Sequence, residues 1–370
     1  MQMQSLLRLL ISLLLAAWNP LAAAEVAVRV ELGPPQTLLA DKALGLRAFP
    51  DGRLAVLSGG QWARVIFPAG VNSVLVEGPD MAQLNKATTV LERGKPGEFD
   101  NGYAGINAVV KARNGELAAF YHAEDQEGME SVGNGIPGFY CRIALAVSND
   151  GGATFEKRGP VLAGSAAKKL GGLADQGVGE PWVLAEPSGQ YWYAYYSSHE
   201  RLLGRGVDIC VARCRVGDAL RPDGWKKFYQ GAFSEPGLGG KDSPIMTGSA
   251  KADAVLAQVV FSPELRQFIM IFCLNAWSEG KSAKRSGMYV AFSQDGIEWP
   301  KERMQQIWKV PVIAQTGSEV AWHPTFVPSD STGRRGWLYY GYSENWGWEA
   351  PSKPHYLVRR PIEFTATPAK

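Results

Sequence analysis

GVGEPWVLAEPSGQYWYAYYSSHE, residues 177–200, has the composition of a β-hairpin. An apolar run at 181–185 is followed by Pro-Ser-Gly, and a second run at 191–196 alternates aromatic and small residues. Two runs of strand length joined by turn residues predict two antiparallel strands. The open end of this hairpin carries Glu180 on one strand and Ser-Ser-His-Glu, residues 197–200, on the other. This cluster of ionisable residues is the first candidate for a functional site.

The same layout returns along the chain. Its copies, given with the residue that takes the place of Glu180, are residues 106–125 with Asn107, residues 257–277 with Gln258 and residues 322–346 with His323. A weaker copy opens near Gly45, with Asp51-Gly52 as its turn. A repeat of roughly 60 to 80 residues that holds about four strands is typical of a propeller blade. The sequence therefore predicts an all-β fold, a five-bladed β-propeller.

The N-terminal segment has the features of a secretory signal peptide. Arg8 is the only charged residue in residues 1–24, an apolar run fills residues 9–18, and Ala-Ala-Ala precedes Glu25. The apolar run is too short to span a bilayer. We expect cleavage after residue 24, a periplasmic or extracellular location, and a mature chain, residues 25–370, that forms a single propeller domain with no membrane span.

Composition narrows the class of partner. The formal net charge of +2 on 370 residues argues against nucleic-acid binding. The high content of glycine, tryptophan and tyrosine fits an all-β chain with many turns, and aromatic faces also suit sugars. The four cysteines, which are Cys141, Cys210, Cys214 and Cys273, show no disulfide framework. We expect buried free thiols, with a Cys141–Cys210 bridge as the alternative.

Two turns share the pattern S-x-D followed by glycine and an aromatic residue. They are residues 148–155, around Asp150, and residues 293–299, around Asp295. They resemble the Asp box of sialidases and the S-x-D-G-x-x-W turn of five-bladed glycosidase propellers. In such a turn the carboxylate accepts backbone N–H bonds and the glycine takes a positive φ. We expect both aspartates to build turns and to take no part in catalysis.

The ends of the chain are expected to meet. Residues 25–32, EVAVRVEL, alternate polar and apolar side chains as an edge strand does. We expect this segment to complete the last blade and so to close the ring. In a propeller the inner-strand starts and the second-strand ends lie on one face, which places the four histidines there and the two Asp turns on the opposite face.

The hairpins also resemble the blades of five-bladed glycoside hydrolases of the arabinanase and β-xylosidase type. The resemblance rests on Glu180-Pro181-Trp182 before a strand, on Ser188-Gly189 in the turn, and on the tyrosine-rich second strand that ends in Ser197. Those enzymes place carboxylates at the inner-strand starts of successive blades. This chain departs from that pattern, because the other starts carry asparagine, glutamine and histidine. The resemblance implies a carbohydrate-active protein, a glycoside hydrolase acting on a poly- or oligosaccharide at the propeller pore.

Glycoside hydrolysis in most families needs two carboxyl groups that flank the scissile bond. We expect Glu180 as the acid, with a pKa raised by a neighbouring carboxylate and by burial, Asp100 as the base and Asp175 as a modulator. Asp100 and Asp175 could instead cap loops between blades. The residues expected to bind substrate on the same face are Asn107, His122, His199, Glu200, Gln258, Trp277, His323 and Glu344.

Two other functions compete with hydrolysis. The missing carboxylates would suit a glycan-binding propeller that has no catalytic activity. His122, His199 and His323 have the chemistry of zinc ligands, but no H-x-x-x-H or similar spacing supports a metal site. We therefore expect neither a metal nor another cofactor, and a carbohydrate as the partner.

Overall fold

The computed structural model describes residues 27–58, 61–131, 137–171, 175–199, 207–218, 220–248, 252–275, 285–310, 318–346 and 354–367. The predicted signal peptide lies outside these ranges, as do Glu200 and Trp277. The helical elements of the described chain are three short 3₁₀ helices, η1 (Ala43–Gly45), η3 (Pro222–Gly224) and η5 (Lys301–Arg303). Every other regular element is a β-strand, so the all-β prediction is confirmed.

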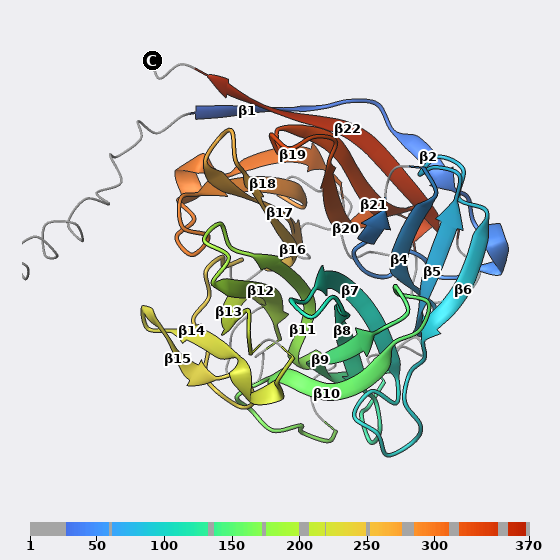
Figure 1. The fold of residues 1–370 in the computed structure, drawn as a ribbon, viewed down its shortest axis with the longest axis vertical. Coiled ribbons are helices and arrows are strands. Elements are labelled where there is room, and N and C mark those ends of the chain that lie inside the picture. The colour runs from blue at the N-terminus through green and yellow to red at the C-terminus, as the bar shows by residue number, and fades with distance from the viewer. Residues whose placement is uncertain are drawn as a thin grey trace, which may run out of the picture.

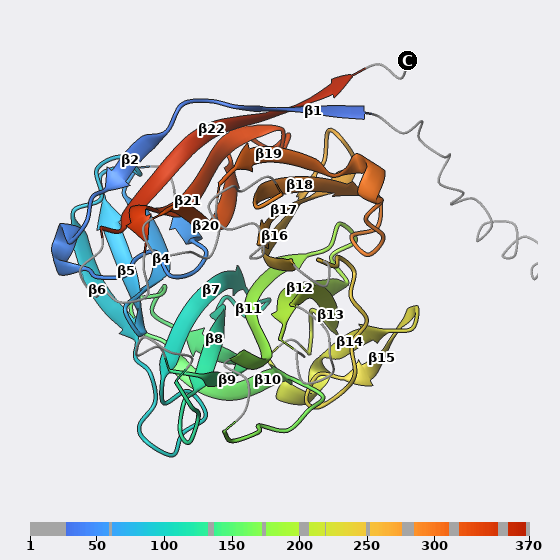
Figure 2. The ribbon, with the colours of Figure 1, turned by 180° about the vertical axis from the view of Figure 1, so that it is seen from behind.

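The described strands form four sheets that stand around a common centre (Figures 1 and 2). We divide them into five units. Unit I contains β3 (Ala55–Ser58), β4 (Ala63–Ala69), β5 (Asn72–Gly78) and β6 (Lys86–Leu91). Unit II contains β7 (Tyr103–Lys111), β8 (Leu117–Asp125), β9 (Phe139–Ser148) and β10 (Glu156–Ala163). Unit III contains β11 (Asp175–Ala185), β12 (Tyr191–Ser198), β13 (Asp208–Arg215), β14 (Lys226–Tyr229) and β15 (Ala232–Pro236). Unit IV contains β16 (Asp253–Ser262), β17 (Gln267–Asn275), β18 (Gly287–Ser293) and β19 (Gln305–Lys309). Unit V contains β20 (Ser318–Pro328), β21 (Arg335–Trp346) and β22 (Tyr356–Thr367), with β1 (Ala27–Leu32) and β2 (Gln36–Leu39) from the other end of the chain.

The N-terminal strand lies against the C-terminal one. β1 pairs antiparallel with β22 in a register that runs from Ala27↔Thr367 to Leu32↔Ile362. β2 pairs with the other end of the same strand, at Gln36↔Arg359. Figure 1 shows β1 and β22 side by side along the rim of the molecule. Each strand therefore covers an edge that the other would leave open.

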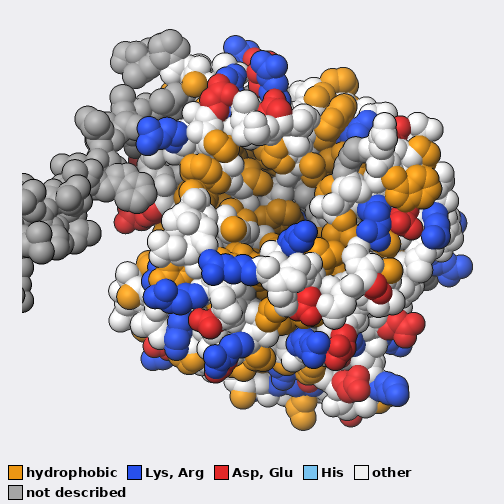
Figure 3. Space-filling model, in the orientation of Figure 1, with side chains coloured by type: hydrophobic (Ala, Val, Ile, Leu, Met, Phe, Trp, Pro, Cys, Tyr) orange, Lys and Arg blue, Asp and Glu red, His pale blue; other side chains and the backbone are white. Residues whose placement is uncertain are grey.

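The hydrophobic core is divided into clusters that lie between successive units. Clusters of buried side chains join units I and II, II and III, III and IV, and IV and V. A further cluster joins unit V to unit I, and it contains Phe67 of β4 beside Tyr339 of β21. Each described unit is thus packed against a neighbouring unit on both sides, and this packing holds its inner strand in place. Figure 3 shows a hollow near the centre of one face, with hydrophobic side chains inside it and charged side chains around it.

Units II and III share one sheet, which the sequence did not predict. Their junction is a parallel pairing of β9 with β11 at Phe139↔Asp175, Tyr140↔Gln176 and Cys141↔Gly177. Gly177 has a φ of +89°, and a Cβ there would lie 2.2 Å from the carbonyl oxygen of Cys141. Only glycine fits this approach. The junction brings the start of β11 against unit II.

A bulge interrupts the inner strand of units II to V. The register shifts between Ile106 and Ala108, Gly179 and Trp182, Val255 and Gln258, and Trp322 and Thr325. Glu180, Leu256 and His323 lie in three of these bulges with φ values of +55°, +60° and +54°. A positive φ is uncommon outside glycine, and bulges re-aim side chains beside functional sites. In unit IV the bulge residue is therefore Leu256, two positions before the predicted Gln258.

The first unit corrects one prediction. Asp51-Gly52 was expected to be the turn of the first hairpin, but β3 begins after it, at Ala55, and pairs with β4 beyond Ser58. Asp51 and Arg53 therefore precede an inner strand, as Asp100 precedes β7. Asp-Gly has the composition of a turn, but these two residues lie before β3 and not between the two strands of the hairpin.

The two S-x-D turns are held by their aspartates. Asp150 Oδ1 accepts the backbone N–H groups of Ala153 and Thr154, both at 3.0 Å, and Asp295 Oδ1 accepts those of Ile297 and Glu298 at 2.8 and 2.9 Å. Hydrogen bonds from Thr154 and Ser148 lower the pKa of Asp150. Both turns follow third strands, so they lie at the ends of the units opposite to Glu180.

The four cysteines are buried and free, and no disulfide joins Cys141 to Cys210. Among the described helices, none combines the length and the hydropathy that a membrane crossing needs.

Candidate functional site

Glu180 lies where several units meet. It sits in the bulge of β11, and its Oε2 accepts a hydrogen bond of 2.5 Å from Ser197 Oγ on β12. Its backbone N–H donates to Nδ1 of His122 in unit II at 3.1 Å, and its carbonyl oxygen accepts from Nη2 of Arg53 in unit I at 3.0 Å. Backbone and side chain are thus both fixed, which a strained conformation requires.

Arg53 is a site residue that the sequence analysis missed. Its side chain is fully buried, and Asn107 Oδ1 accepts from both its backbone N–H (3.0 Å) and its Nη1 (3.1 Å). Asn107 Nδ2 in turn donates to the carbonyl oxygen of Gly105 at 2.9 Å. Asn107, predicted to bind substrate, therefore positions Arg53. Burial lowers the pKa of Arg53 to about 10, so the guanidinium keeps its charge at neutral pH.

Three histidines surround Glu180, and each has a carboxylate partner. His122 Nε2 lies 3.0 Å from Glu124 Oε1, His199 Nδ1 lies 3.1 Å from Asp175 Oδ2, and His323 Nε2 lies 3.6 Å from Asp51 Oδ1. The three histidines are 6%, 6% and 7% exposed, respectively. They come from units II, III and V, so the structure brings together three predicted residues from distant parts of the chain. Asp175 belongs to this group as the partner of His199.

The ring of His122 is held in one tautomer. Its Nδ1 accepts the backbone N–H of Glu180, so the proton of the neutral ring lies on Nε2 and is donated to Glu124. The rings of Tyr103 and Phe139 stand edge-on to it, with centroids at 5.6 and 5.8 Å. Phe139 also contacts the ring of His199 at 6.1 Å. Aromatic side chains thus fix two of the three imidazoles.

The charges around Glu180 reverse the predicted direction of its pKa shift. Burial by itself favours the protonated acid, but the electrostatic influence of His199, His122, His323 and Arg53 outweighs it and lowers the pKa of Glu180. The sequence analysis expected a neighbouring carboxylate to raise this pKa. The structure instead places imidazoles and a guanidinium nearest to Glu180, with the carboxylates behind the imidazoles. Glu180 is therefore an ionised carboxylate at neutral pH, which disfavours its predicted role as the acid.

Asp100 does not join this group. It is 1% exposed, its Oδ2 lies 2.6 Å from Nζ of Lys157, and the hydroxyl of Tyr121 donates to the same oxygen at 3.1 Å. Tyr121 and His122 are consecutive on β8, so their side chains point to opposite faces of the sheet. Asp100 therefore lies between units I and II, on the face of unit II that carries Tyr121. Glu180 lies on the other face of unit II, where it contacts His122. A base at Asp100 facing an acid at Glu180 is not what the structure shows.

Gln258 and Glu344 also lie apart from the histidines. The amide of Gln258 pairs with both backbone groups of Phe326, at 2.9 Å through Nε2 and 2.5 Å through Oε1, and the side chain is 2% exposed. It joins unit IV to unit V. Glu344 is exposed near the end of β21. Glu200 and Trp277 lie outside the described residues.

Metal binding was a competing hypothesis for the three histidines. Within the described ranges, no group of three or more histidine, cysteine, aspartate or glutamate side chains has the arrangement of a metal site. The imidazole nitrogens of His122 are taken by Glu180 and Glu124, which leaves that ring no lone pair for a metal.

Comparison with known proteins gave matches only among solved structures. No family model matches the chain, and no curated protein does. A family 117 glycoside hydrolase of Zobellia galactanivorans superposes with a TM-score of 0.54 at 10% identity, over 93% of each chain. An α-L-arabinofuranosidase from Lactobacillus brevis has a TM-score of 0.55 at 12% identity, over 87% of this chain and 91% of that one. An α-L-arabinofuranosidase of family 93 from Fusarium graminearum, solved with arabinobiose, has a TM-score of 0.53 at 10% identity, over 88% of this chain and 97% of that one.

These neighbours are glycoside hydrolases of the β-propeller type, as the resemblance of the hairpins predicted. At such low identity the likeness establishes the fold. The chain thus has the β-propeller fold of these neighbours.

Proposed function

We propose that this chain is an exported carbohydrate-active protein, a glycoside hydrolase that acts at the site around Glu180. The observation that carries the proposal is the placement of the Glu180 carboxylate among polar side chains from four parts of the ring, which are Arg53 before unit I, His122 of unit II, Ser197 and His199 of unit III, and His323 of unit V. The fold of the neighbours supports the same class, and two of them are named α-L-arabinofuranosidases. An arabinose-containing poly- or oligosaccharide is therefore the first substrate to test.

The architecture that we propose is a five-bladed propeller closed by the N-terminal strand. The five units supply the blades, and the hydrophobic cluster between units V and I supports closure. The pairing of β1 with β22 supplies the outer strand of the last blade. In this arrangement all inner-strand bulges face one pore mouth.

In the proposed mechanism Glu180 is the ionised carboxylate of the catalytic pair. A carboxylate in this place can activate water or stabilise the positive charge that develops on the sugar ring. The proton for the leaving oxygen then comes from a carboxyl–imidazole pair, and Asp175 with His199 is our first choice. Asp175 lies on the same strand as Glu180, and its side chain is 24% exposed, so a substrate can reach it.

A glycan-binding propeller without catalytic activity is the second candidate. It is favoured by the separation of Asp100 from Glu180, because the predicted pair of facing carboxyl groups does not form. Ionised Glu180 would then accept hydrogen bonds from sugar hydroxyls, and the imidazoles would flank the sugar.

A substrate screen separates the two candidates. The wild-type protein would be incubated with aryl α-L-arabinofuranoside, arabino-oligosaccharides and a panel of other oligosaccharides, with product release and binding measured side by side. Turnover of any of them supports the hydrolase. Binding without turnover supports the second candidate, and neither binding nor turnover would contradict both.

Export is the other part of the proposal. It rests on the predicted signal peptide, which lies outside the described residues. N-terminal sequencing of the protein after secretion from a bacterial host should give Glu25 as the first residue. An intact N-terminus on protein that stays in the cytoplasm would contradict export.

A further inference from the structure

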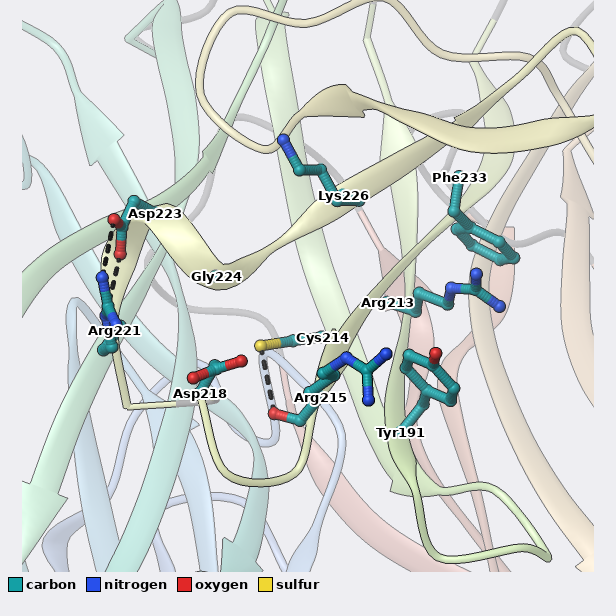
Figure 4. A pocket seen from close by; sticks show the side chains of 10 residues that line it. All are labelled: Tyr191, Arg213, Cys214, Arg215, Asp218, Arg221, Asp223, Gly224, Lys226 and Phe233. Carbon is teal, nitrogen blue, oxygen red and sulfur yellow. Dashed lines mark hydrogen bonds and ion pairs between the residues drawn. The ribbon is translucent and has the colours of Figure 1, made fainter.

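A pocket far from Glu180 has its own chemistry. It has a volume of about 390 Å³ and is lined by residues of unit III between the start of β12, the end of β13 and the loop before β14 (Figure 4). This volume falls within the range of small-ligand pockets. Tyr191 pairs with Arg215 at the end of the sheet that carries the Ser188-Gly189 turn, whereas Glu180 lies near the Ser197 end. The pocket therefore opens at the opposite end of the strands.

Cationic side chains dominate the lining. Four cations, which are Arg213, Arg215, Arg221 and Lys226, face two carboxylates, Asp218 and Asp223. Arg221 is neutralised by Asp223, through contacts of 3.2 and 3.0 Å. Burial, together with the nearby carboxylates, raises the pKa of the Cys214 thiol to about 12, so the sulfur at the back of the pocket adds no charge. The balance that remains is positive.

Arg213 is held ready for a ligand. Its guanidinium lies 4.4 Å from the ring centroid of Tyr191 and 4.3 Å from that of Phe233, so it is stacked between two aromatic side chains (Figure 4). The guanidinium of Arg215 lies 5.5 Å from the same tyrosine ring. Among the described residues, neither arginine forms an ion pair with a carboxylate. Arg213 also forms a side-chain hydrogen bond with Tyr193. A stacked guanidinium keeps its remaining in-plane N–H donors available and loses little entropy when it binds.

We propose that this pocket is a second, non-catalytic site that binds the anionic group of an acidic sugar, a carboxylate or a sulfate. Planar guanidinium donors match these oxyanions, and charge-assisted hydrogen bonds to them are the strong ones. A neutral sugar would leave two cations without an anionic partner and would find the faces of Tyr191 already covered by arginine. The site is independent of hydrolysis at Glu180, and it would anchor an acidic polysaccharide at the other end of the protein.

The test is calorimetric titration with an oligogalacturonate, a sulfated galactan oligosaccharide and a neutral arabino-oligosaccharide of similar length. We expect binding of at least one acidic oligosaccharide, weakened by added salt because exposed charges are screened. Arg213→Gln and Arg215→Gln should each raise its Kd by about tenfold or more. Arg213→Gln removes a stacked guanidinium and could perturb the sheet. Arg215 is exposed, so Arg215→Gln should fold in either case. The matched control is Arg113→Gln, an exposed arginine in the turn of the neighbouring unit, which should leave the Kd unchanged.

Glu180→Gln tests the location of the site. The acidic oligosaccharide should bind this variant as tightly as it binds wild type. If Glu180→Gln abolishes binding and Arg215→Gln does not, the ligand sits at the Glu180 site and the proposal is overturned. Absence of binding by both acidic probes, or equal binding of the neutral one through the same arginines, would overturn it as well.

Discussion

Ser197 donates a hydrogen bond of 2.5 Å to Glu180 across the first two strands of unit III. The serine is 1% exposed, and its oxygen also lies 3.4 Å from the backbone nitrogen of Leu256 in the bulge of unit IV. One hydroxyl thus connects the carboxylate to the neighbouring unit. A hydrogen bond to a charged acceptor contributes about 1.5–3 kcal/mol.

Ser197→Ala should therefore lower the free energy of unfolding by about 1.5–3 kcal/mol at neutral pH. The neighbouring serine is the matched control, because Ser198 points to the other face of β12 and lies 3.4 Å from Asp242. Urea unfolding and ligand titration of both variants make the comparison. Ser197→Ala should also weaken binding at the Glu180 site, while Ser198→Ala should not. Equal binding losses in the two variants would show that the serine acts only through the fold.

The lowered pKa of Glu180 predicts how stability depends on pH. A carboxylate whose pKa is lower in the folded than in the unfolded state stabilises the fold above the unfolded pKa, about 4.3. That contribution disappears as the pH falls through the folded pKa. Wild type should thus lose stability relative to Glu180→Gln as the pH falls below about 4.3. Urea titrations of both proteins from neutral to acid pH measure it. A shift in favour of wild type would mean that the pKa is raised, as the sequence analysis expected.

Gln258 should act on stability and not on the site. Both ends of its amide pair with the backbone of Phe326, so Gln258→Ala leaves a buried N–H and a buried carbonyl without partners. Each unpaired group costs about 1–3 kcal/mol. We expect a clearly lower midpoint of urea unfolding with unchanged ligand affinity under conditions where the variant is folded. A loss of affinity in the folded variant would return Gln258 to the binding site.

Asp100 should be structural through its ion pair with Lys157. Removing one partner of a buried pair leaves an unpaired charge, at a cost of about 3–5 kcal/mol for full burial. Lys157 is 28% exposed, so the loss in Asp100→Ala should lie at or below the lower end of that range. The double variant Asp100→Ala, Lys157→Met should regain part of it, because the orphan charge is removed as well. The pair is not the source of stability if the double variant is no more stable than the single one.

Much of the fold could be predicted from the sequence because its repeat is regular. Strand-length runs with turn residues between them recur, and each predicted inner strand from unit II onward appears in the structure. The weak first copy was misread, since Asp51-Gly52 has the composition of a turn but lies before β3. That error concealed Asp51 and Arg53. The only available signal was positional: both precede an inner strand, as Asp100 precedes β7.

The candidate site could be located but not assembled from the sequence. Glu180, His122, His199 and His323 were placed on one face by topology, and the structure brings them together. The sign of the pKa shift depends on which charges stand nearest, and bulge geometry decides that. In unit IV a bulge two residues long puts Leu256 where Gln258 was expected. Loop residues such as Asp100 follow no strand periodicity, so their side of the sheet could not be predicted.

The central claim is that Glu180 is the ionised catalytic group of a glycoside hydrolase. The most direct measurement is the rate of hydrolysis of the best substrate from the screen by wild type, Glu180→Gln and the control Glu116→Gln, a half-buried residue at the far end of unit II. Glu180→Gln should cut kcat by about 10² to 10⁴, the usual contribution of an acid or base, while Glu116→Gln keeps the wild-type rate. Equal rates in all three proteins would remove Glu180 from the mechanism and contradict the account.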